Sequence, residues 1–207
     1  KQRNALLKQE EEPDAGVMDV LEEMMSMDAS YIYECRKAFV SEFTPIFQSL
    51  YLSLCDNDVE KVSIQYASHI SRGELKHQLT SFRAKERIVG YTLHGVHRDD
   101  LELYLNDYPI RHEGSQGQTK TYFIALKLAQ FLYLKERGSQ RTPLLLLDDI
   151  FDKLDAGRVA RIINYVSGNA FGQIFITDTN REHLDTILAT TTKDYKLFHV
   201  TDGEIKE

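Results

Sequence analysis

Apolar residues recur at three- and four-residue intervals early in the chain, and this spacing predicts helix from Met18 to about Cys55. Pro45 lies within that stretch, so the pattern allows either two helices or one kinked helix. Residues 62–66 alternate between apolar and polar side chains and predict a short strand. Residues 71–87 predict a polar helix followed by a loop. The first part of the chain is therefore expected to be mainly helical.

The pattern changes near residue 89. Strict alternation over residues 101–105, a turn, and a return over residues 108–111 predict a hairpin. Residues 119–137 are apolar on nearly every side and stop at Gly138, which predicts a buried helix with a glycine C-cap. Residues 143–147 show no alternation, as expected of a parallel strand that is covered on both faces.

The rest of the chain continues this alternation of strand and helix. The predicted elements are a helix begun by Asp155 and ending near Val166, a second buried strand over residues 173–177, a short helix over residues 181–189, and a hairpin over residues 195–206 that turns at Asp202-Gly203. Residues 88–207 thus predict an α/β layer, and residues 1–87 predict a separate helical arm.

Composition and charge narrow the function classes. The 207 residues are 42% hydrophobic and 28% charged, as in an ordinary globular protein. No apolar run approaches the roughly 18 residues that span a bilayer, so we expect no membrane partner. A net charge of −7 argues against a generally basic nucleic-acid coat. Residues 71–87 carry five Lys or Arg against two Glu, either as a solvated face or as a surface for DNA.

Two further observations concern the cell compartment and the ends of the chain. Cys35 and Cys55 lie in apolar contexts without a CxxC motif, so we expect buried free thiols and a reducing, cytoplasmic location. The chain opens at Lys1 rather than Met, and we expect further sequence upstream.

The residues just before the predicted buried helix suit phosphate binding. Ser115 and Gln118 form a Ser-x-x-Gln capping box. A cap alone would explain both residues. Gly117, however, costs a helix about 1 kcal/mol relative to Ala, and its lack of a side chain lets a ligand approach the backbone. Free N–H groups with little bulk around them favour a phosphate at this helix start.

Two acids end the apolar strand that follows. Asp148 and Asp149 come directly after residues 144–147, at the carboxyl end of the strand, where ligands bind in open α/β sheets. Carboxylate oxygens suit Mg²⁺, which is held by one or two acids together with waters and substrate phosphates. We expect Asp148 to orient the metal and Asp149 to polarise an attacking water. The alternative is a pair of solvated acids in a turn.

Taken together, these motifs resemble one family. A Ser-x-Gly-Gln helix start, a buried helix, an Asp-Asp strand end and a following Leu154-Asp155 have the order of an ABC-type signature, Walker B motif and D-loop. The stretches Gly95-Val-His-Arg-Asp-Asp-Leu and Leu147-Asp-Asp-Ile-Phe-Asp-Lys-Leu-Asp, like the opening Lys1-Gln-Arg-Asn-Ala-Leu-Leu-Lys, are similar to the RecF family. The resemblance implies part of an ABC/SMC-like ATPase head with a helical arm.

The resemblance also implies a function. RecF proteins are cytoplasmic DNA-repair ATPases that dimerise on ATP, bind gapped DNA, and act with RecO and RecR to load RecA. By the same resemblance, the turn that holds Ser115, Gln116, Gly117 and Gln118 would contact the γ-phosphate of ATP on another subunit. Asp148 would serve Mg²⁺, Asp149 would be the catalytic carboxylate, and Asp155 would lie in the D-loop at the dimer interface.

Some positions depart from that family pattern. Val96 stands where the family usually has proline, and Asp178-Thr179 stands where many ABC enzymes have a switch histidine. The chain has no Gly-x-x-x-x-Gly-Lys-Ser/Thr, so we expect the isolated chain to be inactive as an ATPase. For His97 and Arg98 we favour a structural or interface role over a catalytic one.

Other classes stay open at this point. The head of a RecN-like or Rad50-like protein would need long heptad coiled coils. A transporter subunit would favour a Leu-Ser-Gly-Gly-Gln signature and a switch histidine, and this chain has neither. A non-enzymatic interaction domain is the third alternative, against which the retention of both Asp148 and Asp149 weighs weakly.

Overall fold

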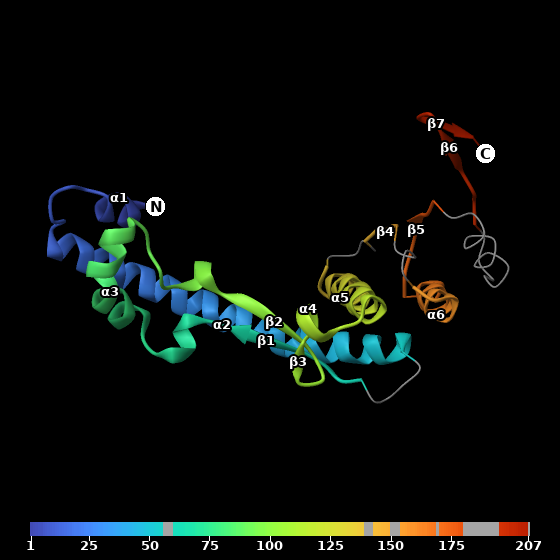
Figure 1. Ribbon diagram of the computed structural model, residues 1–207, viewed down its shortest axis with the longest axis horizontal. Coiled ribbons are helices and arrows are strands. Elements are labelled where there is room, and N and C mark those ends of the chain that lie inside the picture. Colours follow the sequence, from blue (N-terminus) through green and yellow to red (C-terminus); the bar gives the residue numbers. More distant parts are fainter. Residues whose placement is uncertain (56–59, 139–142, 150–153, 169, 180–194, 207) are drawn as a thin grey trace. The chain divides into compact units, whose positions relative to one another are not determined.

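The computed structural model describes residues 1–206 except 56–59, 139–142, 150–153, 169 and 180–194 (Figure 1). The chain divides into two compact units: the first is Lys1–Pro45 with Lys61–Glu113, and the second is Ile46–Glu60 with Gly114–Glu207. The boundary expected near residue 88 lies inside the first unit, and it stays a prediction about the domains of the intact protein.

The first unit combines helices with an antiparallel sheet. Its elements are α1 Gln2–Leu7, the first part of α2 Ala15–Leu54, β1 Val62–Ala67, η1 His69–Arg72, α3 Leu75–Val89, η2 Val96–Arg98, β2 Asp100–Leu105, β3 Tyr108–Pro109 and α4 Ile110–Glu113. The helix α2 begins where the Asp14 carboxylate accepts a hydrogen bond from the backbone N–H of Val17, at 2.9 Å. It runs without interruption through Pro45, so the two-helix alternative is wrong.

The sheet of this unit has the order β1-β2-β3, in which Val62 is opposite Leu105. The predicted strand over residues 62–66 and the outgoing strand of the hairpin are confirmed. The predicted return strand was too long, since only Tyr108 and Pro109 pair with β2 and α4 begins at Ile110. Ile110 is fully buried, and a turn of helix places its side chain in the core instead of continuing the hairpin.

The predicted polar helix is α3, and two of its positive charges pair with carboxylates of α2. Arg83 contacts the carboxylates of Asp19 and Glu22, and Lys76 contacts Glu23. These pairs hold α3 against α2, beside which α3 lies in Figure 1. Cys35, which we expected to be buried, is exposed on α2, and Cys55 is half-buried.

A buried guanidinium organises this side of the first unit. Arg3 lies 2.9 Å from Glu22 and 2.6 Å from Glu86, and both of these carboxylates are fully buried. Arg3 also donates to the Thr92 hydroxyl at 2.9 Å. Burial acts to raise the pKa of Glu22, but hydrogen bonds from Arg83 and Arg3 outweigh it and leave that pKa below its ordinary value. One cation from α1 thus joins α2 to α3.

We predict that Arg3→Met destabilises the protein by about 3–5 kcal/mol, because it leaves two buried carboxylates without their shared cation. The matched control is Lys76→Met, which breaks a half-exposed pair and should cost less than about 1 kcal/mol. Urea unfolding measures both values. Equal, small losses in the two variants would contradict the importance of the buried network.

The second unit contains the predicted α/β elements. They are α5 Gln116–Arg137, β4 Leu145–Asp148, α6 Ala156–Val166, β5 Ile174–Thr177, β6 His199–Thr201 and β7 Glu204–Lys206, together with the last turns of α2. The strands β4 and β5 are parallel, and β6 and β7 form the predicted hairpin around Asp202-Gly203. The helix predicted over residues 181–189 lies outside the described residues.

Two burial expectations for this unit were wrong. Leu145 and Leu147 are buried, but Leu144 and Leu146 are 60% and 69% exposed, so β4 is covered on one face only. The apolar run suggested cover on both faces, whereas the residues that the structure describes pack against one face of β4 and leave the other exposed. β5 is also not fully buried. Similarly, α5 leaves Phe123 and Leu134 substantially exposed.

The end of α5 is the predicted glycine C-cap, although its backbone conformation is extended rather than left-handed. A Cβ at Gly138 would lie 2.7 Å from the Leu134 carbonyl oxygen, so close approach to the helix end is what requires glycine here. Across the described residues, no helix has the length and apolar character needed to cross a membrane.

The core of the second unit joins α2 to α5. Phe47 and Tyr51 from the last turns of α2 pack on Tyr122 of α5, with the rings of Phe47 and Tyr122 4.8 Å apart and edge to face. All three side chains are fully buried. Aromatic pairs in this geometry contribute beyond the area they bury, so they fix α5 against α2.

Candidate functional site

The start of α5 has the predicted capping box. The Ser115 hydroxyl accepts from the backbone N–H of Gln118 at 3.2 Å, and the Gln118 carboxamide oxygen accepts from the Ser115 N–H at 2.9 Å. The first N–H groups of a helix have no partner inside the helix, and they carry partial positive charge. With Gln116 and Gly117 in this turn, the start of α5 has the backbone features that favour an anion.

The carboxylate of Glu60, which sequence reasoning did not single out, forms a hydrogen bond with this turn. The Gln118 carboxamide nitrogen donates to Glu60 at 2.7 Å, and the Tyr51 hydroxyl donates to the same carboxylate at 2.6 Å. Burial pushes the pKa of Glu60 upward, but the hydrogen bonds from Tyr51 and Gln118 outweigh burial and leave the pKa below its ordinary value. Glu60 therefore stays an anion near neutral pH.

The two predicted acids end β4 in different conformations. The Thr177 hydroxyl, at the end of β5, donates to the Asp148 carboxylate. Asp149 has a left-handed backbone with φ 47°, which is uncommon for a residue with a side chain. The Lys120 ammonium donates to the Asp149 carbonyl at 2.8 Å, and the Asp149 N–H donates to the Thr177 carbonyl at 3.2 Å. The turn after the strand is thus held from both α5 and β5.

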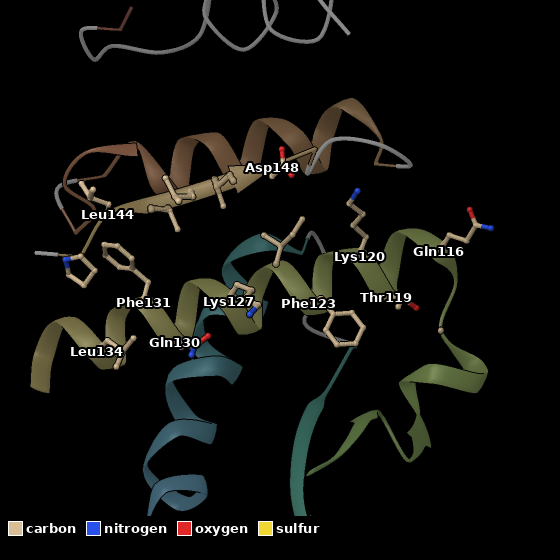
Figure 2. A pocket seen from close by; sticks show the side chains of 16 residues that line it. Gln116, Thr119, Lys120, Phe123, Lys127, Gln130, Phe131, Leu134, Leu144 and Asp148 are labelled. Carbon is tan, nitrogen blue, oxygen red and sulfur yellow. The ribbon is translucent and has the colours of Figure 1, made fainter. Parts of the chain in front are cut away.

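An open cavity of about 960 Å³ lies between α5 and β4 (Figure 2). Gln116 and Lys120 line it from the start of α5, and Asp148 lines it from the end of β4. Lys120 points from α5 toward the strand end that carries Asp148. Farther along, the walls are mainly apolar, with Lys127 and Gln130 among the lining residues. The polar end of the cavity therefore combines a helix N-terminus, an ammonium and a carboxylate.

The predicted cap of the next helix is confirmed and connects to α5. The Asp155 carboxylate accepts from the Arg158 N–H at 2.9 Å, and it also faces the Arg158 guanidinium at 3.2 Å. Arg158 also donates to the Thr121 hydroxyl of α5 at 3.3 Å. A single arginine thus links the start of α6 to the first turns of α5.

The Gly95–Leu101 stretch lies in the first unit and has structural contacts. His97 lies 3.1 Å from the Thr92 carbonyl, and the Arg98 guanidinium is stacked over the Tyr91 ring at 5.5 Å. Asp99 of this stretch pairs with α2, where the Arg36 guanidinium contacts its carboxylate at 2.8 Å. These contacts support the structural role that we favoured for His97 and Arg98.

Of the predicted site residues, the structure brings Gln116 and Asp148 to one cavity. Ser115, Gly117 and Gln118 lie in the same helical turn as Gln116, and Asp149 follows Asp148. Sequence reasoning missed Lys120, Glu60 and Arg158. Lys120 could have been singled out as a cation five residues after the helix cap. Glu60 and Arg158 act through contacts distant in sequence, for which no local pattern exists.

The strand end fits a magnesium ion better than a transition metal. Within the described ranges, no three His, Cys, Asp or Glu side chains converge as a metal-ligand set. Mg²⁺ does not need such a set, because it keeps several waters and takes one or two carboxylates together with phosphate oxygens. Asp148, at the rim of the cavity, meets that requirement.

We predict that Asp155→Ala costs about 1 kcal/mol of stability through the lost helix cap, whereas Asp155→Asn, which can still cap, costs less. The hydrogen bond from the Arg158 N–H holds the pKa of Asp155 below its ordinary value of 3.8. The folded pKa is thus the lower one, so the charged cap stabilises at neutral pH and this contribution is lost as pH falls through the folded pKa. Urea unfolding from pH 7 to pH 2 should show wild type losing its advantage over Asp155→Asn. A constant difference would contradict this account.

Comparisons with known proteins point to one family. No family model matches the chain. It is 55% identical over 206 residues to the DNA replication and repair protein RecF of Phocaeicola vulgatus, covering 100% of this chain and 55% of that protein. The RecF of Bacteroides fragilis is 53% identical with the same coverage, and that of Porphyromonas gingivalis is 50% identical over 205 residues, covering 99% and 56%. The chain spans about half the length of these relatives.

Fold and site together define part of an ATPase head of the ABC/SMC type with a helical arm. A solved structure of the recombination mediator protein RecF with ATP, in the RecFOR pathway, superposes with a TM-score of 0.77 at 26% identity, over 99% of this chain and 54% of that one. A second structure, of RecF with ATPrS, gives a TM-score of 0.75. The chain belongs to the RecF family.

Proposed function

We propose that the intact protein is a cytoplasmic recombinational DNA-repair mediator, an ATPase that forms a homodimer on ATP at gapped DNA and acts with RecO and RecR to load RecA. The observation that carries this proposal is that the second unit presents both a capped helix start at Ser115 and a strand end with Asp148, the two parts that the composite ATP sites of a dimer require. The relatives' name, DNA replication and repair protein, and the RecF–ATP structure support it. The alternatives, a RecN-like or Rad50-like head and a transporter subunit, have no comparable support.

In this proposal the chain carries one half of a composite ATP site. The turn of residues 115–118 closes over the γ-phosphate of ATP held by another subunit, where first-turn N–H groups and the helix dipole stabilise negative charge. Because Gln118 is engaged with Ser115 and Glu60, the contacts fall to the Ser115 hydroxyl and to the backbone of Gln116 and Gly117. ATP therefore acts as part of the dimer interface.

The strand end supplies the chemistry of hydrolysis. Asp148 would hold Mg²⁺, which would neutralise charge on the phosphates. The Asp149 carboxylate accepts a proton from the attacking water, and the contacts of Lys120 and Thr177 with its backbone keep it at the strand end. Asp155 lies at the dimer interface, in the D-loop. Loss of the γ-phosphate removes the contact with the Ser115 turn and opens the dimer, which releases DNA.

Dimerisation tests the proposal directly. We predict that the intact wild type is a monomer alone and a dimer with ATP and Mg²⁺ by light scattering. Ser115→Arg should stay monomeric because its side chain fills the phosphate position, whereas Ser115→Thr, which keeps the hydroxyl cap, should dimerise. A wild type that remains monomeric, or a Ser115→Arg variant that dimerises equally well, would favour a non-enzymatic interaction domain.

Turnover tests the role of Asp149. We predict that Asp149→Asn lowers the rate of ATP hydrolysis by about 10²-fold or more, as expected for losing a general base, while ATP-dependent dimerisation persists. Asp107→Asn, in the turn after β2, is the control and should hydrolyse ATP at the wild-type rate. Steady-state phosphate release measures both. Turnover near wild type in Asp149→Asn would assign the base elsewhere.

A further inference from the structure

Glu60 connects the buried core of the second unit to the turn of residues 115–118. One carboxylate oxygen accepts from the hydroxyl of Tyr51, which is fully buried, at 2.6 Å. The other accepts from the carboxamide of Gln118 at 2.7 Å. Tyr51 packs on Tyr122 of α5, so the anchor of this carboxylate is itself fixed to the helix that begins at Ser115.

The contact with Glu60 decides how the Gln118 carboxamide is oriented. A carboxylate accepts hydrogen bonds and donates none, so the Gln118 nitrogen must face Glu60. The Gln118 oxygen then faces the Ser115 N–H and accepts a hydrogen bond from it at 2.9 Å. Without an acceptor at position 60, this orientation of the carboxamide would lose one of its two partners, and the capping box would be less firmly closed.

The negative charge of Glu60, which lies near the start of α5, is offset by a positive charge close to it. Burial raises the pKa of Glu60, the hydrogen bonds from Tyr51 and Gln118 lower it, and the positive charge of Arg158 lowers it further, so that the ionised form is favoured. Arg158 is held between Asp155 and Thr121. Glu60 and Arg158 thus brace the first turns of α5, and Arg158 also contacts the start of α6.

We propose that Glu60 is a positioning residue for the γ-phosphate contact. It holds Gln118, and through it Ser115, in the geometry that closes on ATP of another subunit, without touching nucleotide itself. This inference rests on the proposed function, and it adds a residue outside every recognised motif of the chain. It requires that loss of Glu60 weakens ATP-dependent dimerisation more than it weakens ATP binding by the single subunit.

The test compares variants of the intact protein. The probes are ATP with Mg²⁺ for dimerisation, by sedimentation, and a fluorescent ATP analogue for binding to the dilute monomer. We expect Glu60→Ala to weaken dimerisation by about tenfold or more, the effect of losing a hydrogen bond to a charged group. Analogue binding should change less than about twofold, which is well below that effect. Glu60→Gln, which keeps an acceptor oxygen, should restore most of the dimerisation. Glu102→Ala is the matched control, since Glu102 accepts from Tyr104 on an exposed strand at 3.0 Å.

Each outcome decides between the alternatives. A Glu60→Ala variant that dimerises like wild type overturns this inference but not the proposed function. A parallel loss of dimerisation, analogue binding and thermal stability marks a purely structural role for Glu60 and also overturns this inference. A wild type that stays monomeric with ATP overturns the proposed function and this inference together. Should Glu60→Ala not fold, Tyr51→Phe decides, because it keeps the ring packing and removes only the hydroxyl; unchanged dimerisation in that variant overturns the inference.

Discussion

The packing of Phe47 and Tyr51 on Tyr122 is the constraint on which the second unit depends. These fully buried rings hold the last turns of α2 against α5, and α5 carries at its start the capped turn of residues 115–118. The same helix supplies Lys120 to the turn after β4 and Thr121 to Arg158 of α6. The positions of the turn of residues 115–118, of the strand-end acids and of the Asp155 cap therefore follow from one packed helix.

The features that depend on neighbouring residues were predictable from the sequence. The Ser115–Gln118 capping box, the Asp155 cap and the Asp202-Gly203 hairpin each form from residues within a few positions of one another, and each is present. The parallel pairing of β4 with β5 was also predictable, because a strand, a helix and a second strand in succession favour it. The order of these motifs was enough to indicate the family.

The features that depend on distant residues were not predictable. Glu60 and Gln118 are 58 positions apart, and Lys120 and Asp149 are 29 apart, so no periodicity or motif joins them. The exposed face of β4 was mispredicted for a related reason: an apolar run reports the character of its own side chains, not what lies over them. Arg3, which follows Lys1 and Gln2 in a polar opening, is buried because α2 and α3 each bring it a carboxylate.

The central claim is that Ser115 and Asp149 of this chain serve different ATP sites of one dimer. Mixing Ser115→Arg with Asp149→Asn in the intact protein tests it most directly. In a mixed dimer, Asp149 from the first variant and Ser115 from the second would meet at one complete site. The account predicts that ATP hydrolysis in the mixture rises well above the sum of the two variants measured separately. A mixture no more active than that sum would show that the two residues do not complement one another across a dimer interface, and would contradict the account.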